Sequence, residues 1–221
     1  MANRHPLPER DAISELTTGR LSVYVRCLSY LESIRQKTVS SAELAERFHL
    51  NSAQIRKDLA CFGEFGTRGV GYDVSHLKEH LVRELGIDRS RRVIIAGAGN
   101  LGIALADYRG FNENGFEIVG LVDVDPRKVG RTSRTGVPVF PYSNLSEIVK
   151  REHVEIGIIA VPAEAAQTVY DHLLEAGLTA ILNFAPVQLR AEGSVKVRSV
   201  DLRINLESLS FFLKNVEDGP P

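Results

Sequence analysis

The sequence predicts an α/β protein with three parts: a small helical domain that carries a β-hairpin, a domain with a doubly wound parallel sheet, and a C-terminal helix. Amphipathic helix patterns and a glycine-rich segment fill the first 88 residues. An apolar strand then runs into a glycine cluster at 97–102, and strand and helix patterns alternate beyond it. We expect the two domains to span residues 1–88 and 89–201, with a C-terminal helix and tail at 202–221.

The glycine cluster has the spacing of a dinucleotide-binding fingerprint. A strand at 93–96 leads directly into Gly97, Ala98, Gly99, Asn100, Leu101 and Gly102. The first glycine permits a tight turn, the second lets the backbone approach a pyrophosphate, and the third lets the next helix pack closely with its N-terminal amides facing the anion. The cluster therefore predicts a Rossmann domain that binds a dinucleotide through these six residues. A glycine turn in a nucleotide-free α/β domain is the alternative.

An acidic residue follows the next strand, as the fingerprint requires. The strand at 118–122 ends at Asp123, whose carboxylate is expected to hold a ribose diol. Val124 and Asp125 come next, and no arginine is placed to receive a 2′-phosphate. The site is therefore expected to favour NAD over NADP.

Composition and length narrow the class of protein. The chain has 221 residues, 43% of them hydrophobic and 25% charged, as in ordinary globular proteins. Its start shows no signal-peptide pattern, and Cys27 and Cys61 form neither a disulfide framework nor a zinc spacing, so we expect a cytoplasmic protein without a metal site. The residues outside the fingerprint leave little room for a catalytic domain. Residues 1–92 contain 15 Lys and Arg against 12 acidic residues, which favours an anionic partner for the N-terminal part.

The N-terminal part has the pattern of a helix-turn-helix. A first helix is expected at about 20–36, and Ser40 with Glu43 forms a capping box before the second. Asn51 and Gln54 offer the same kind of start to the third helix, which turns Ile55 and Leu59 inward. Its outer face is expected to contact DNA through Ser52, Ala53, Gln54, Arg56 and Lys57. Gln54 or Arg56 would present paired donors to base edges and Lys57 would neutralise phosphate, whereas the alternative is a solvated charged face.

The glycine-rich segment at 62–72 is interpreted as a hairpin wing. Its glycines let the backbone approach a sugar-phosphate surface, and Arg68 at the tip is expected to enter a minor groove. Contacts to DNA are expected from Thr67, Arg68, Gly69 and Tyr72. A nucleotide-cradling glycine loop is the rival interpretation, but no helix start follows the glycines directly; Ser75 is expected to open the next helix, which Gly86 closes.

The α/β alternation continues beyond Asp123. Helices are expected near 145–152 and 163–176, and strands at 156–160 and 180–183. Because ligands of such sheets lie at the carboxyl ends of the strands, the segments Val161-Pro162 and Phe184-Ala185-Pro186 are expected near the cofactor. An equally good interpretation is that each segment only shapes a loop and does not contact a cofactor.

Taken together, the motifs resemble those of the Rex family of bacterial redox-sensing transcriptional repressors. The resemblance rests on QIRKDL (54–59), FGTRGVGY (65–72), LADY (105–108), VDVDP (122–126), VP (161–162) and NFAP (183–186), which adds Asn183 to the cofactor residues. It covers about residues 15–215. It implies a homodimer that binds an inverted-repeat operator, senses the ratio of NADH to NAD⁺, and releases DNA when NADH binds. It also implies that the last helix, about 204–214, crosses to the partner subunit.

The resemblance further implies a set of switch residues. The family can place an aromatic residue after the aspartate matched by Asp201, where it closes over the partner's nicotinamide, but this chain has Leu202. An apolar lid remains, without ring stacking. We hypothesise that Arg26, Tyr108 and Asp201 exchange partners between the two states; the alternative is three unrelated surface groups.

Three other functions fit the sequence less well. An NAD-dependent oxidoreductase is disfavoured because no tyrosine has a lysine four residues on and no general base is evident. A CoA-binding domain is disfavoured because Asp123 would repel the 3′-phosphate of CoA. A thiol redox sensor at Cys61 lacks a nearby resolving cysteine.

Overall fold

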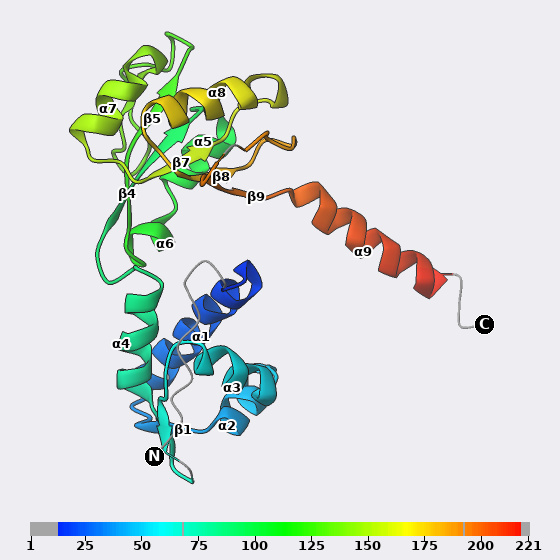
Figure 1. Ribbon diagram of the computed structural model, residues 1–221. Helices are drawn as coiled ribbons and strands as arrows, with labels where there is room; N and C mark the ends of the chain where they lie inside the picture. Colours follow the sequence, from blue (N-terminus) through cyan, green and yellow to red (C-terminus); the bar gives the residue numbers. More distant parts are fainter. Residues whose placement is uncertain (1–12, 68, 192, 218–221) are drawn as a thin grey trace. The chain divides into compact units, whose positions relative to one another are not determined.

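The computed structural model describes residues 13–67, 69–191 and 193–217, with side chains up to 214. The chain separates into two compact units, the first ending at Arg89 and the second beginning at Ser90 (Figure 1). Each unit is described by itself. Arg68, which the sequence predicts to contact DNA, lies outside the described residues.

The first unit is a winged helix-turn-helix domain, as the sequence predicts. Its elements are α1 (Glu15–Ser33), β1 (Thr38–Val39), α2 (Ser41–Phe48), α3 (Ser52–Ala60), β2 (Gly66–Thr67), β3 (Gly71–Asp73) and α4 (Val74–Glu84). The three strands form an antiparallel sheet in the order β1-β3-β2. Strand β1 was not expected from the sequence, because two residues are too short to show a period.

Local capping explains where these helices begin. Ser14 accepts the Thr17 N–H at 3.2 Å, so α1 starts before the predicted residue 20. Ser40 and Glu43 form the predicted capping box of α2. Asn51 accepts the Gln54 N–H at 3.0 Å, but the Gln54 side chain does not return the bond. The prediction of a second capping box is therefore wrong, and a simple N-cap starts α3.

The other end of the helical domain needs two corrections. The first helix was predicted to run to about residue 36, but Ile34 caps the end of α1 and is 45% exposed. The helix predicted to open at Ser75 begins at Val74, because Asp73 accepts the His76 N–H and serves as the N-cap. Gly86 follows α4 with φ +65°, the left-handed geometry of a C-terminal glycine.

One hydrophobic core holds the first unit together. Its members come from α1, α2, α3 and α4, and the fully buried ones include Leu21, Leu28, Leu44, Ile55 and Leu77. Ile55 and Leu59 of α3 lie in this core, as predicted from their spacing of four residues. Helix α3 therefore has a fixed buried face and a fixed outer face.

The second unit is a Rossmann domain with a six-stranded parallel sheet. Its elements are β4 (Arg91–Ala96), α5 (Asn100–Ala106), α6 (Arg109–Asn112), β5 (Phe116–Asp123), β6 (Val139–Pro141), a 3₁₀ turn (Tyr142–Asn144), α7 (Leu145–Arg151), β7 (Ile156–Ile159), α8 (Ala163–Glu175), β8 (Ala180–Asn183), β9 (Lys196–Ser199) and α9 (Leu202–Glu217). The strand order is β6-β5-β4-β7-β8-β9. The chain reverses direction of winding beside β4, which places a ligand crevice at the carboxyl end of this strand.

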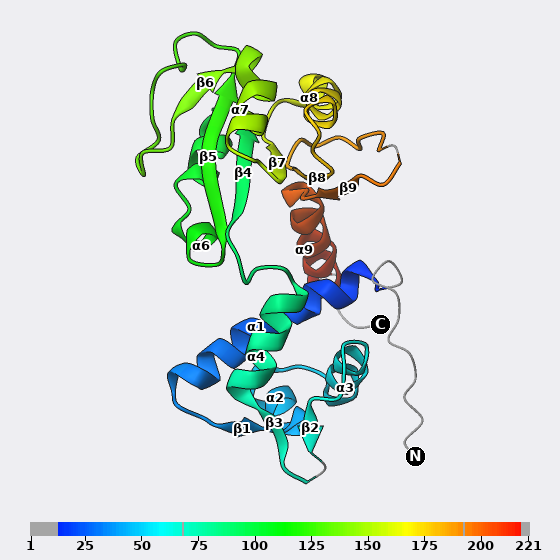
Figure 2. The same ribbon diagram turned by 60° about the vertical axis from the view of Figure 1, so that its left-hand side comes forward.

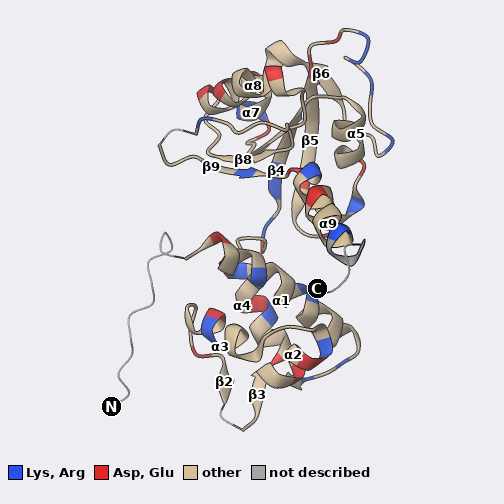
Figure 3. Ribbon diagram, turned by 90° about the vertical axis from the view of Figure 1, so that its right-hand side faces the viewer, with Lys and Arg blue, Asp and Glu red and all other residues tan. Residues whose placement is uncertain are grey.

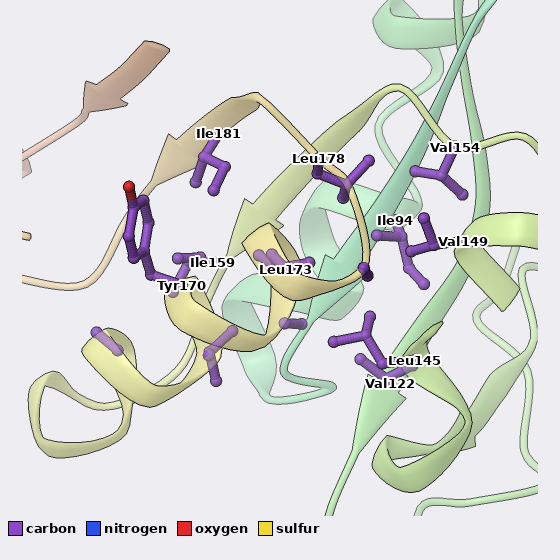
Figure 4. Packing of buried hydrophobic residues seen from close by; sticks show 14 of the residues in the cluster. Ile94, Val122, Leu145, Val149, Val154, Ile159, Tyr170, Leu173, Leu178 and Ile181 are labelled. Atoms are coloured by element: carbon purple, nitrogen blue, oxygen red, sulfur yellow. The ribbon is translucent and has the colours of Figure 1, made fainter. Parts of the chain in front are cut away.

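Side chains of β4 alternate between two cores on opposite faces of the sheet. Ile94 and Ala96 pack with α7 and α8, whereas Val93 and Ile95 pack with α5 and α6. Figure 2 shows α7 and α8 beside one face of the sheet. Figure 4 shows the first of these cores, in which Leu173 and Tyr170 of α8 lie against Ile159 and Ile181.

Four elements of the second unit were not expected from the sequence: α6, β6, the 3₁₀ turn at Tyr142–Asn144, and β9. Each has four residues or fewer, and Lys196 and Arg198 interrupt the apolar pattern of β9. The last helix, α9, is longer than the predicted 204–214, and every side chain from 202 to 214 is exposed. None of the described helices is long and apolar enough to cross a membrane.

Candidate functional site

The three glycines of the fingerprint have three different environments. Gly97 has φ +105°, and a Cβ there would lie 2.4 Å from the carbonyl oxygen of Ala160. A Cβ on Gly102 would lie 1.8 Å from the carbonyl oxygen of Gly97, so α5 packs directly on the loop. A Cβ on Gly99 would meet no atom within 4 Å. The loop thus has a tight turn, a closely packed helix, and open space before the helix N-terminus, where a pyrophosphate fits.

Asp123 ends β5 beside this loop. Its side chain is 8% exposed and accepts hydrogen bonds from the N–H groups of Ala98 at 2.7 Å and Asp125 at 2.8 Å. Lys128 donates to the same carboxylate at 2.9 Å. Burial opposes ionisation, but these donors outweigh it and hold the pKa of Asp123 below its usual value. An ionised carboxylate is therefore fixed beside the glycine loop.

A cleft of about 550 Å³ lies at the carboxyl ends of β4, β5 and β7. Five predicted cofactor residues line it: Gly97, Gly99, Asp123, Val161 and Pro162. Ala98 and Gly102 are buried behind the loop, whereas Asn100 and Leu101 are exposed at the start of α5. Its volume lies within the range of small-molecule and cofactor sites, about 300–1,000 Å³.

The segment after β8 does not line this cleft. Ala185 is 5% exposed and Asn183 is fully buried. The Asn183 amide donates to the carbonyls of Ala185 at 3.2 Å and Val187 at 3.0 Å, and its oxygen accepts the Ala185 N–H at 2.9 Å. Asn183 therefore fixes the conformation of the loop that follows β8. Phe184 is half-buried and Pro186 is exposed.

Sequence reasoning missed several residues of the cleft. Lys128, Tyr142, Ala165, Thr168 and Val169 contribute to its lining. The Tyr142 hydroxyl forms a hydrogen bond of 2.8 Å with Nδ1 of His172, and burial raises the pKa of this tyrosine. These residues come from segments up to 46 positions beyond Asp123 in the chain, so no local spacing signals them. Lys128 is the exception: a cation five residues after the acid was available as a signal.

A second candidate surface lies in the winged-helix unit. A groove of about 670 Å³ is lined by Arg56 of α3, Ser41 of α2, and the predicted wing residues Thr67, Gly69 and Tyr72. Arg56 donates to the Ser41 hydroxyl at 2.9 Å. Glu43 also lines the groove, so its charge is mixed. Figure 3 shows the basic residues of α3 and the acidic residues of α2.

The outer face of α3 is largely as predicted. Ala53, Arg56 and Lys57 are exposed, and Ser52 is half-buried. Gln54 differs from expectation, because its amide nitrogen donates to Oδ1 of Asp58 at 2.7 Å. The prediction that Gln54 presents paired donors is corrected: a glutamine so engaged offers one donor and one acceptor.

The predicted switch residues belong to different units. Arg26 is exposed on α1 of the first unit. Tyr108 is 59% exposed and contacts Phe111 edge-on, with ring centroids 5.0 Å apart. Asp201 accepts the Arg203 N–H at 2.9 Å at the start of α9, and Leu202 is 62% exposed. Within the second unit, Tyr108, Asp201 and Leu202 thus retain accessible side chains.

Known proteins resemble the chain along nearly its whole length. Residues 12–60 match a family described as a putative DNA-binding protein N-terminus, and residues 88–187 match one described as a CoA binding domain. A protein of Carboxydothermus hydrogenoformans named redox-sensing transcriptional repressor Rex is 51% identical over 205 residues, 91% of this chain and 97% of that protein. The Rex of Streptomyces coelicolor is 47% identical, covering 93% of this chain and 80% of that protein.

Solved structures give the same result. RSP, described in complex with β-NAD⁺ and operator DNA, has a TM-score of 0.88 and 38% identity, with 93% of this chain and 94% of that chain covered. RSP in complex with β-NADH has a TM-score of 0.82 and 36% identity, with 93% and 96% covered. With its winged-helix unit, its fingerprint loop and these relatives, the chain belongs to the Rex family of redox-sensing transcriptional repressors.

Proposed function

We propose that this protein is a DNA-binding transcriptional repressor that senses the ratio of NADH to NAD⁺ and releases its operator when NADH binds. It is not an enzyme, and the oxidoreductase alternative is set aside. One observation carries the proposal: a single chain joins a winged-helix unit to a Rossmann unit whose glycine loop leaves space for a pyrophosphate beside Asp123. The relatives named Rex share this pairing of units over about nine-tenths of the chain.

The cofactors of this function are NADH and NAD⁺. Gly97 to Gly102 would hold the pyrophosphate, Asp123 the ribose, and Val161 and Pro162 the wall of the cleft. The oxidised nicotinamide ring carries a positive charge that the reduced ring lacks. Phe184 and Pro186 of one subunit, together with the partner's Leu202, would form an apolar environment. Such an environment would disfavour NAD⁺ because its charged ring would lose its hydration. Asn183 and the buried Ala185 would act by holding this segment in place.

The operator is double-stranded DNA with an inverted repeat. The N-terminal end of α3 would enter the major groove with Ser52, Ala53, Gln54 and Arg56, and Lys57 would contact phosphate. The wing would follow the adjacent backbone with Thr67, Gly69 and Tyr72, and Arg68 at the tip would enter the minor groove. The groove that Arg56 shares with the wing supports this arrangement, because it places both elements on one surface of the unit.

The protein acts as a homodimer in the cytoplasm. An inverted repeat presents two equivalent half-sites, which a two-fold dimer matches. The exposed apolar side chains of α9 support this assembly, with the helix crossing to the partner subunit. In this arrangement Arg26, Tyr108 and Asp201 would exchange partners between the DNA-bound and NADH-bound states. Arg26→Ala and Asp201→Ala are expected to bind operator but to release it poorly with NADH; normal release by both variants contradicts the exchange.

The deciding experiment is a DNA-binding titration. A labelled library of inverted-repeat DNA is offered to the protein at fixed salt, and the selected DNA is then titrated with NADH and separately with NAD⁺. We expect release by NADH at concentrations at which NAD⁺ has little effect. If no DNA is bound under any condition while NADH still binds, the repressor function is wrong.

A further inference from the structure

The recognition helix α3 is tied to α1 by one buried carboxylate. Asp58 lies in the second turn of α3 and is 2% exposed. Its carboxylate accepts two hydrogen bonds from Arg20, one from Nε at 2.6 Å and one from Nη2 at 2.8 Å, so the pair is bidentate. The Tyr24 hydroxyl donates to it at 2.8 Å. Both donors come from α1, so this carboxylate fixes where α3 sits on its neighbour.

Asp58 accepts a fourth hydrogen bond, and this one comes from α3 itself. Nε2 of Gln54, one turn earlier, donates to Oδ1 of Asp58 at 2.7 Å. A carboxylate only accepts hydrogen bonds, so the amide nitrogen and not its oxygen must face Asp58. Burial opposes ionisation of Asp58, but the bonds from Arg20, Tyr24 and Gln54 outweigh it and keep its pKa below the usual value. The orientation of the Gln54 amide is thereby set before any ligand binds.

An amide held in this way keeps two groups for a partner. One N–H is used by Asp58, which leaves the second N–H and Oε1, and neither has another partner among the described residues. The major-groove edge of adenine offers the complementary pair, an acceptor at N7 and a donor at N6. Guanine offers two acceptors there, which a single N–H cannot satisfy. Gln54 lies in the first turn of α3, the part of a recognition helix that contacts base edges.

We propose that Gln54 reads one adenine in each half-site of the operator, and that Asp58 is the positioning residue that aims its amide. This inference rests on the proposed function, because it requires operator binding. Arg20 and Tyr24 contribute by holding Asp58 from α1. The network therefore links the seating of the recognition helix to the choice of base.

The test uses base analogues in the operator. The full-length protein first selects an operator from a randomised inverted-repeat library. Each adenine is then replaced in turn by 7-deazaadenine, which lacks the N7 acceptor but keeps the N6 amine and the base pair. We expect one adenine per half-site at which the replacement weakens wild-type binding by about fivefold or more, as the loss of a bidentate contact requires. Gln54→Ala should show no penalty at that position, and Asp58→Asn should reduce it below about twofold.

The ratio between the two DNAs separates positioning from stability. A helix that is merely loosened binds both DNAs more weakly and keeps their ratio. Glu32→Gln is the matched control. Glu32 also forms an ion pair between α1 and another helix, but its partner is Lys78 of α4, not a residue of α3. This variant should show the same penalty for 7-deazaadenine as the wild type. If the penalty is unchanged in Gln54→Ala, the inference is wrong, whether or not Asp58→Asn folds. If Asp58→Asn folds and keeps the penalty, the inference is wrong as well. Failure of the wild type to select any DNA overturns the proposed function instead, whereas selection without a sensitive adenine overturns only this inference.

Discussion

Lys128 donates to Oδ2 of Asp123 at 2.9 Å, the same oxygen that receives the Ala98 N–H at 2.7 Å. The acid expected to bind the ribose therefore lies beside a cation, which offsets part of the negative charge that would repel a 2′-phosphate. The lack of an arginine directly after Asp123 is thus not the whole basis of cofactor choice, because Lys128, five residues on, reaches the same carboxylate.

Lys128→Met should sharpen the preference for NADH over NADPH. Removing the ammonium leaves Asp123 less compensated, so affinity for NADPH should fall by about fivefold to tenfold, the effect of one charge at a partly exposed site. Affinity for NADH should change much less, because a ribose diol is neutral. Titrations that follow the fluorescence of each reduced cofactor measure both constants. Lys150→Met, an exposed lysine of α7, is the control, and unchanged NADPH binding in Lys128→Met would contradict the prediction.

Gly99→Ala and Gly102→Ala should separate binding from stability. A Cβ at Gly99 meets no protein atom within 4 Å, so we expect an unchanged melting temperature and NADH affinity lowered at least about tenfold through a clash with the pyrophosphate. A Cβ at Gly102 would lie 1.8 Å from the Gly97 carbonyl oxygen. This variant should lose about 3 kcal/mol of unfolding free energy, as overpacked sites do. Thermal unfolding together with NADH titration checks both; equal effects of the two variants would argue against distinct roles.

Asn183→Ala should destabilise the Rossmann unit. The substitution removes the amide that bonds to the carbonyls of Ala185 and Val187, and these bonds are buried or partly buried. We expect a loss of about 3 kcal/mol in the free energy of unfolding, the cost of leaving several such groups unpaired. Denaturant unfolding measures it. Asn144→Ala provides the comparison, because the Asn144 side chain bonds only to Ser143 at an exposed position among the described contacts. A stable Asn183→Ala that binds NADH weakly would instead place Asn183 on the cofactor.

How far the sequence predicts this structure depends on how local each signal is. The capping box at Ser40 and the strand 180–183 were predicted, because caps and apolar runs are local. The tight turn at Gly97 and the close helix packing at Gly102 were predicted from the spacing of the glycines. The bond from Arg20 to Asp58 was not predictable, since it joins residues 38 positions apart through the packing of α1 on α3. Asn183 was named from family resemblance, but only the folded loop shows what its amide holds.

Acid should lower the folding stability of the wild type more than that of the Asp107→Asn variant. Burial opposes ionisation of Asp107, but hydrogen bonds from Thr135, Ser133 and Arg134 lower its pKa to about 2. A depressed pKa in the folded state contributes stability that is complete above the ordinary value of 3.8 and is lost as the pH falls toward about 2. Melting temperatures at several pH values across this window measure the difference. Asp171→Asn, at an exposed position, should follow the wild type; parallel curves for Asp107→Asn and wild type would contradict the assignment.

A single charge on the apolar face of α9 should separate the homodimer. Leu202, Leu206, Leu209 and Leu213 follow a helical spacing of three to four residues, and each is 61–67% exposed. A free helix gains nothing from such a stripe, whereas the proposed homodimer would bury it in the partner subunit. Leu209→Glu would then place a charge inside that contact. We expect the mass measured by light scattering to fall from about twice 24.4 kDa to 24.4 kDa. Operator affinity should fall with it, because a monomer meets one half-site at a time. Ser210→Glu adds the same charge to the neighbouring polar position and should leave the dimer intact; a dimeric Leu209→Glu would show that α9 does not carry the assembly.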